Sequence, residues 1–146
     1  GLAAFPGATW LMHEPEIAAV RDHLSGMSAK LAAAGDEADG EVAELVSQER
    51  ELLSRVRPAA DRLTSEVHLY PTAGVTCGAA GLLLACASRT IVVAGDAAVT
   101  QGYFEAGRVF EQASDVEQAR ATLGELYELA DEIVPGHDNA FRVMGR

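Results

Sequence analysis

Two uninterrupted apolar runs in the middle of the chain restrict its fold more than any other feature. They span residues 81–86 and 90–94, and a short polar stretch with Ser88 and Arg89 separates them. Continuous apolar runs of this length are typical of strands that are buried on both faces. The polar stretch predicts a tight hairpin turn between them. We therefore expect a sheet at the centre of a layered fold.

Strand and helix signals alternate on both sides of these runs. Residues 67–70 form a further strand candidate, and residues 133–134 form another that Pro135 and Gly136 end. Between them, Ser114 followed three residues later by Glu117 matches a capping box and predicts the start of a helix. The apolar face of this helix would consist of Val116, Ala119, Leu123, Leu126 and Ala130. This alternation predicts an α/β fold.

The first 62 residues are mainly helical in pattern. Residues 9–12 form a short strand candidate, and a helix is expected from Glu14, with Pro15 tolerated in its first turn. Residues from about 25 to 62 are rich in Ala and Glu, and turn formers at 35–40 interrupt them. An amphipathic helix is predicted for residues 41–56, and Pro58 ends it. Its apolar stripe is either a packing face or a surface for a partner, including a second copy of the chain.

Composition excludes several classes of protein. The 146 residues fit one domain, and 22 acidic residues against 11 basic ones give a formal charge of −11. This charge repels a phosphate backbone, so we expect no nucleic-acid partner, and it weakly favours cation binding. No run reaches the roughly 18–20 apolar residues of a membrane span, and no signal-peptide pattern is visible. We therefore expect a cytoplasmic protein with no membrane association.

The two cysteines, Cys77 and Cys86, do not form a recognisable motif. They are nine residues apart, which matches neither a CxxC redox motif nor a paired zinc motif. Free cysteines are commonly buried, so we expect both side chains to lie within the apolar strands.

Ligand-capable side chains follow directly on two of the apolar strands. Asp96 comes after Gly95 at the end of one strand, and His137 comes after Gly136 at the end of another. In layered α/β folds, loops at strand ends bring residues from distant parts of the sequence to one point. The adjacent glycines allow sharp turns there. A carboxylate and a neutral imidazole are both good zinc ligands, although each residue alone is more often structural.

The order of these segments resembles the second half of the metallo-β-lactamase superfamily. In that family a TPGHTPG-like loop, a strand-terminal GD and a late PGH supply zinc ligands in sequence. Here residues 71–78, Gly95-Asp96 and residues 135–138 stand in the same order. Residues 1–8 also look like the segment that follows the family's HxHxDH loop, where a GGL-like helix start leads into a strand.

The resemblance implies a four-layered αββα sandwich that is incomplete at its N-terminal side. It implies one partial domain over residues 1–146, with a helical insertion at about 25–62. Asp96 would be the carboxylate that bridges two zinc ions, and His137 would be the imidazole of the second metal site. Asp138 and Asn139 would orient His137, although turn formation is an equal alternative.

Two departures from the family pattern affect this expectation. The HxHxDH motif, which supplies most of the family's ligands, is absent from the chain. The loop position that holds a ligating His in the family is Val75 here, and an isopropyl group cannot bind zinc. Catalytic zinc sites generally use three protein ligands, so the chain by itself is not expected to hold a dinuclear site. His13, His23 and His68 are not expected to replace the missing ligands.

Three hypotheses follow. The chain is a fragment of a zinc-dependent hydrolase that acts on an ester, thioester, lactone or amide. Alternatively, it is a non-catalytic relative with a degraded metal site that serves binding or assembly. A third possibility is a hydrolase with a single metal ion, completed by Asp96, His137 and a segment outside this chain. An unrelated α/β domain is the remaining alternative.

Overall fold

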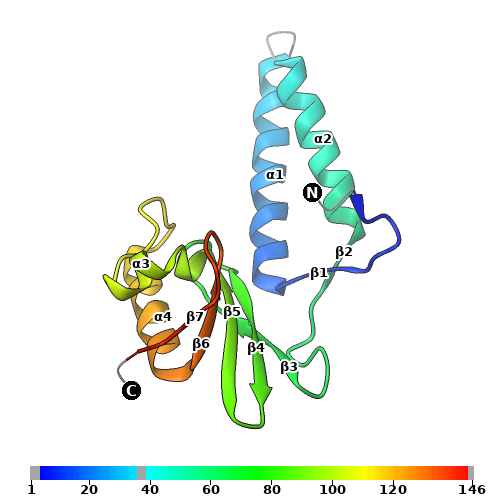
Figure 1. Cartoon of the computed structure of the whole chain (residues 1–146). Helices are drawn as coiled ribbons and strands as arrows, with labels where there is room; N and C mark the ends of the chain where they lie inside the picture. Colours follow the sequence, from blue (N-terminus) through cyan, green and yellow to red (C-terminus); the bar gives the residue numbers. More distant parts are fainter. Residues whose placement is uncertain (1–3, 36–38, 145–146) are drawn as a thin grey trace. The chain divides into compact units, whose positions relative to one another are not determined.

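The computed structural model describes residues 4–35 and 39–144. The chain forms two compact units, Gly1–Pro58 and Ala59–Arg146. Figure 1 shows the elements of both. The first unit holds β1 (Trp10–Met12), α1 (Glu14–Ala34), α2 (Gly40–Arg55) and β2 (Val56–Pro58). The second holds β3 (Val67–Pro71), β4 (Ala80–Cys86), β5 (Arg89–Gly95), η3 (Asp96–Ala98), α3 (Gln101–Glu105), α4 (Val116–Leu129), β6 (Glu132–Pro135) and β7 (Phe141–Arg142).

The first unit is a helical hairpin with a small sheet at its base (Figure 1). The predicted helix from Glu14 is confirmed, but it continues without a break to Ala34, because Gly26 in its interior costs only about 1 kcal/mol and most of its neighbours are good helix formers. The predicted second helix is also confirmed, and the Asp39 carboxylate caps it by accepting from the Glu41 and Val42 N–H groups. Residues 36–38 of the predicted break, and residues 1–3 of the N-terminal resemblance, lie outside the described residues.

Strand β2 was not predicted from the sequence. It follows α2 directly and pairs in parallel with β1, so that Trp10 lies opposite Val56. The Arg55 guanidinium stacks over the Trp10 ring at 4.0 Å and donates to the Pro6 carbonyl at 3.2 Å. The helix ends at Arg55, one residue before the sequence pattern suggested, because Val56 is extended and begins β2.

The second unit is a five-stranded mixed sheet in the order β3-β4-β5-β6-β7. The predicted hairpin is confirmed, since β4 and β5 pair antiparallel with Cys86 opposite Arg89. Strands β5 and β6 pair in parallel, and β7 is an edge strand that was not predicted. The chain therefore has the α/β architecture that the sequence predicted. The four-layer arrangement, the single domain and the insertion at about 25–62 stay predictions.

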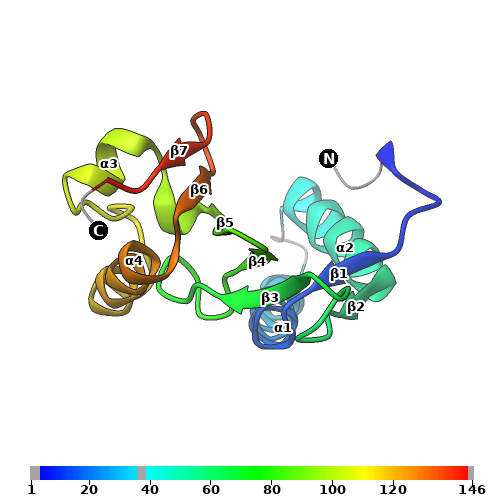
Figure 2. The same cartoon turned by 60° about the horizontal axis from the view of Figure 1, so that its bottom comes forward.

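The core of the second unit lies on one face of this sheet. Helix α4 packs there, as Figure 2 shows for the same view turned by 60°. The predicted apolar face of α4 is confirmed for Ala119, Leu123, Leu126 and Ala130, all of which are buried. They share the core with Val92, Ala94, Ala98, Phe104, Ile133 and Phe141.

The opposite face of the sheet carries large aliphatic side chains that are only partly buried. By register, these are Val67, Leu69, Leu82, Leu84, Ile91, Val93 and Val134. The expectation of strands buried on both faces is therefore wrong for this chain alone. The α3, α4 and η3 segments all contribute to the core cluster on the other face.

Two further predictions are wrong. Cys77 and Cys86 are both exposed, because Cys77 lies in the loop before β4 and Cys86 at the exposed end of that strand. The N-cap of α4 is Asp115 rather than Ser114, and its carboxylate accepts from the Gln118 N–H at 2.9 Å. The Ser114 hydroxyl donates instead to the Gly74 carbonyl at 3.1 Å.

Candidate metal site at the strand ends

The ends of β5 and β6 bring the predicted ligands to one place. The two strands are parallel neighbours, with Val93 opposite Val134 and Gly95 opposite Pro135. Their carboxyl ends therefore lie at the same end of the sheet (Figure 1). Asp96 follows β5 directly, and His137 follows β6 after Gly136. The register shifts between Val93 and Gly95, where the chain turns out of the sheet into η3.

Asp96 and His137 contact each other directly. The His137 Nε2 atom lies 3.0 Å from the Asp96 Oδ1 atom, a hydrogen bond whose donor depends on the imidazole tautomer. The two side chains are 64% and 51% exposed. An interaction this open to solvent contributes little to stability, about 0–1 kcal/mol. The contact therefore matters for the position of two donor atoms rather than for the fold.

Backbone hydrogen bonds hold the two loops together. The Gly136 N–H donates to the carbonyls of Gly95 and Ala98, at 3.0 and 3.1 Å. The His137 N–H donates to the Val99 carbonyl at 2.9 Å. The loop after β6 is thus attached along the 3₁₀ turn η3 that carries Asp96. The carbonyls of Ala98 and Val99 gave no signal in the sequence, because any residue supplies a carbonyl group.

Both glycines beside the candidate ligands have a steric role. Gly95 has a φ of +53°, a conformation that L residues with a side chain rarely adopt. At Gly136 a Cβ atom would lie 2.6 Å from the Asp96 Oδ1 atom and 3.0 Å from the Gly95 carbonyl carbon. The absence of a side chain at Gly136 therefore leaves room for the Asp96 carboxylate.

Asp138 and Asn139 lie in the same loop as His137. The Asp138 carboxylate accepts from the Asn139 N–H at 2.8 Å and from the Gln101 N–H at 3.3 Å. This second contact fastens the loop to the first residue of α3, a link that the sequence did not indicate. That these two residues orient His137 stays a prediction.

The loop that contains Val75 leaves the same end of the sheet. Strand β3 pairs antiparallel with β4, and β4 pairs antiparallel with β5. The carboxyl ends of β3, β5 and β6 therefore all lie at the same end of the sheet. The loop is fixed to α4, because the Thr122 hydroxyl donates to the Ala73 carbonyl at 2.7 Å and the Asp115 N–H to the Gly74 carbonyl. The Ser114 N–H donates to the Val75 carbonyl at 3.0 Å. The side chain of Val75 is half-buried and offers no donor atom.

The donors present do not complete a catalytic zinc site. Asp96 and His137 supply one carboxylate and one imidazole, the correct chemical types for zinc. Among residues 4–35 and 39–144, no group of three or more His, Cys, Asp or Glu side chains is placed to hold a metal ion. His13, His23 and His68 do not join the pair in such a group. Two protein donors are fewer than the three that catalytic zinc sites use.

No protein-family model and no curated protein matches this sequence. Solved structures do match its fold. The chain aligns with AidC, described as a dizinc quorum-quenching lactonase, with a TM-score of 0.63 and 14% identity over 92% of this chain and 49% of AidC. It aligns with the hydrolase AbOPH of the β-lactamase superfamily with a TM-score of 0.61 and 17% identity, over 92% of this chain and 49% of AbOPH.

A third match is a probable metal-dependent hydrolase from Staphylococcus aureus, with a TM-score of 0.59 and 11% identity over 94% of this chain and 48% of the hydrolase. The chain thus spans about half the length of these structures. At such low identity the likeness concerns the fold. The metallo-β-lactamase-like fold that the sequence resemblance implied is confirmed. Of the described helices, none is both long and apolar enough to cross a membrane.

Proposed function

Since the chain has the metallo-β-lactamase fold, we propose that it is the C-terminal portion of a zinc-dependent hydrolase. The observation that carries this proposal is the contact between Asp96 and His137, 3.0 Å apart at the ends of two parallel strands. In the proposal these two side chains are metal ligands, and Asp138 and Asn139 hold the His137 loop in place. The remaining ligands come from a segment outside these 146 residues.

The partly buried face of the sheet supports a missing layer. Seven aliphatic side chains in register lie on that face, and none of them is fully buried. A sheet that is apolar on both faces is stable when both faces are covered. The same outside segment would therefore supply both a second layer and the additional metal ligands.

For the substrate, we propose a small molecule with a hydrolysable carbonyl: an ester, thioester, lactone or amide. The description of AidC as a lactonase favours the lactone within this group. The 51% and 64% exposure of Asp96 and His137 supports access for such a molecule. We further propose a cytoplasmic location with no nucleic-acid partner, consistent with the charge of −11.

The test compares this chain with the protein encoded by its complete reading frame. We expect substoichiometric zinc in the 146-residue chain, and stoichiometric zinc with lactone or ester hydrolysis in the longer protein. In the longer protein, Asp96→Ala and His137→Ala should each remove most of the bound zinc and the activity. His68→Ala serves as the matched control and should retain both. A reading frame without further metal ligands, or unchanged zinc in His137→Ala, would refute the proposal.

A non-catalytic binding or assembly protein is the second candidate, and Val75 favours it. The loop of Val75 leaves the same sheet edge as Asp96 and His137, yet the residue at the ligand position has no donor atom. A longer protein with the full set of other ligands but no bound zinc would support this candidate. In that case the helical hairpin of α1 and α2 is a natural surface for a homodimer, which light scattering would detect.

A further inference from the structure

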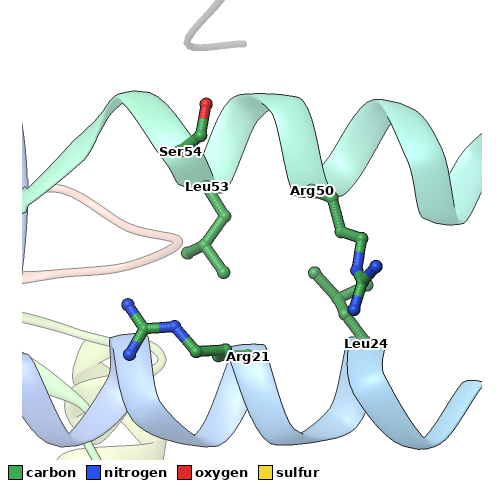
Figure 3. Close-up of a pocket in the computed structure, with 5 residues that line it drawn as sticks. All are labelled: Arg21, Leu24, Arg50, Leu53 and Ser54. Carbon is green, nitrogen blue, oxygen red and sulfur yellow. The ribbon is translucent and has the colours of Figure 1, made fainter. Parts of the chain in front are cut away.

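The helical hairpin contains a hollow that the proposed hydrolase site does not use. It has a volume of about 230 Å³ and lies between α1 and α2, lined by Arg21, Leu24, Arg50, Leu53 and Ser54 (Figure 3). In Figure 3 the side chains of Leu24 and Leu53 point into the space between the helices, and the two arginines extend beside them from opposite helices. At roughly 30 Å³ for each water-sized group, the hollow has room for about seven or eight non-hydrogen atoms.

The floor of this hollow is apolar. Leu24 is 1% exposed, and Leu53 is half-buried. Ser54 contributes little polarity, because its hydroxyl points away from the space in Figure 3 and donates to the Glu51 carbonyl at 2.6 Å. A small apolar group that packs on Leu53 would be partly removed from water, which is favourable.

The two arginines lack acidic partners although the chain is rich in acids. Neither Arg21 nor Arg50 has a carboxylate oxygen within 4.0 Å among the described residues. The positions three and four residues away on the same helices are also uncharged: Ile17, Ala18, Leu24 and Ser25 around Arg21, and Val46, Ser47, Leu53 and Ser54 around Arg50. The acidic residues next to them in sequence, Asp22, Glu49 and Glu51, form no ion pair with either arginine among the described residues, so each guanidinium group can bind an anion.

We propose that this hollow binds a small organic carboxylate with a short alkyl group. The guanidinium group is planar and forms paired hydrogen bonds to a carboxylate, so either arginine can hold the charged end. The alkyl end lies on Leu53, which is half-buried, with the buried Leu24 beneath it. Inorganic phosphate fits less well, because it has no apolar part to cover the floor.

The experiment is a titration of the full chain with butyrate, followed through the backbone amide signals of residues 21–24 and 50–54 by NMR. We expect saturable binding that weakens as salt is added, because the two charges are exposed. Arg21→Gln and Arg50→Gln should each weaken binding about tenfold, which corresponds to a loss of ~1.4 kcal/mol. Lys30→Gln removes the same charge from an exposed position on α1 and should leave the affinity unchanged.

Two further ligands test the two halves of the site separately. Butyramide has the same alkyl group without the charge and should bind much more weakly than butyrate. Phosphate should also bind more weakly, since it lacks the alkyl group. Equal binding of butyramide, equal binding of phosphate, or full affinity in the Arg21→Gln/Arg50→Gln double variant would each overturn the proposal. The amide spectra of the variants show whether the hairpin is still folded.

Discussion

The carboxylate of Asp96 has almost no free space on the side of Gly136. A single added methyl group at Gly136 would overlap the Asp96 Oδ1 atom and press on the backbone of Gly95. Since η3 and the loop after β6 are joined by three backbone hydrogen bonds, the loop cannot move away without breaking them. The contact between Asp96 and His137 thus depends on a residue that has no side chain.

We therefore expect Gly136→Ala to separate Asp96 from His137. It should also lower the free energy of unfolding by about 1 kcal/mol, the low end of the cost of an added group, because the exposed Asp96 carboxylate can turn away while the Gly95 backbone cannot. The imidazole nitrogen signals of His137 in NMR spectra measure the first effect, and urea unfolding measures the second. Gly102→Ala is the control, because a Cβ atom there meets no atom within 4 Å. Unchanged His137 signals in Gly136→Ala would contradict the steric role of Gly136.

A second single residue gives the fold a dependence on pH. Burial raises the pKa of Tyr70 above its ordinary value, and the negative charge of Glu125 and a 3.4 Å hydrogen bond to its Oε2 atom raise it further. The folded chain thus holds this proton more tightly than the unfolded chain does. The resulting stability is fully present below about pH 10 and is lost as the pH rises through the higher pKa of the folded state.

Tyr70→Phe should remove this part of the alkaline loss of stability. Urea unfolding at a series of pH values on both sides of about 10 gives the slopes for both proteins. Glu125→Gln should reduce the slope without abolishing it, since burial of Tyr70 remains. Equal slopes in the parent chain and in Tyr70→Phe would show that the raised pKa has no effect on folding.

For single residues, the sequence predicts which side chains are candidate ligands, but it does not predict the contacts that these side chains make. Asp96 and His137 stood out because each follows an apolar strand and a glycine. Their 3.0 Å contact could not be predicted, because it depends on the parallel pairing of β5 with β6, in which Val93 lies opposite Val134, 41 positions later in the sequence. The prediction that Cys77 and Cys86 are buried is wrong, because residues that are apolar neighbours in the sequence do not cover these side chains in the structure.

Helix α4 connects the sheet with the loop of Val75. Its first turn receives the Asp115 side chain as a cap, while Ser114, Asp115 and Thr122 donate to carbonyls of the loop at residues 73–75. The sequence predicted the apolar face of the helix correctly, since the helical period alone defines it. The cap was placed one residue too early, because Ser114 and Asp115 are both good caps and a contact with a distant loop decides between them.

Asp115→Ala should lower the free energy of unfolding by about 1 kcal/mol, the usual cost of losing an N-cap. Asp115→Asn should retain nearly all of the stability, because an amide oxygen can accept the same hydrogen bond from the Gln118 N–H. Thermal unfolding of the two variants measures the difference. If Ser114 were the cap, Asp115→Ala would have little effect and Asp115→Asn would not differ from it.

At the scale of the whole molecule, the two faces of the five-stranded sheet differ in how deeply their side chains are buried. Val92 is 0% exposed and belongs to the core cluster that includes residues of α4, whereas its neighbour Val93 points to the opposite face and is only partly buried. The sequence could not separate these faces, because an apolar run has no alternation from which to read them. A sheet that is buried on both faces and a sheet that lacks one covering layer have the same pattern of apolar residues in the sequence.

Two neighbouring substitutions measure this inequality. In the 146-residue chain, Val92→Ala should lower the free energy of unfolding by about 2 kcal/mol, because it leaves a cavity in the core. Val93→Ala should cost clearly less, since water already reaches that side chain. In the proposed longer protein the cost of Val93→Ala should rise to that of Val92→Ala. A cost for Val93→Ala that is the same in both proteins would mean that no second layer covers this face.

The exposed thiols have a practical consequence for all of these measurements. Cys77 lies just before β4 at the Asp96 end of the sheet, and Cys86 is the last residue of that strand. The ends of β4 are roughly 20 Å apart, at about 3.3 Å for each residue. Maleimide reagents would therefore reach both native thiols, one near each end of this strand, so that either can carry a probe without any engineered cysteine.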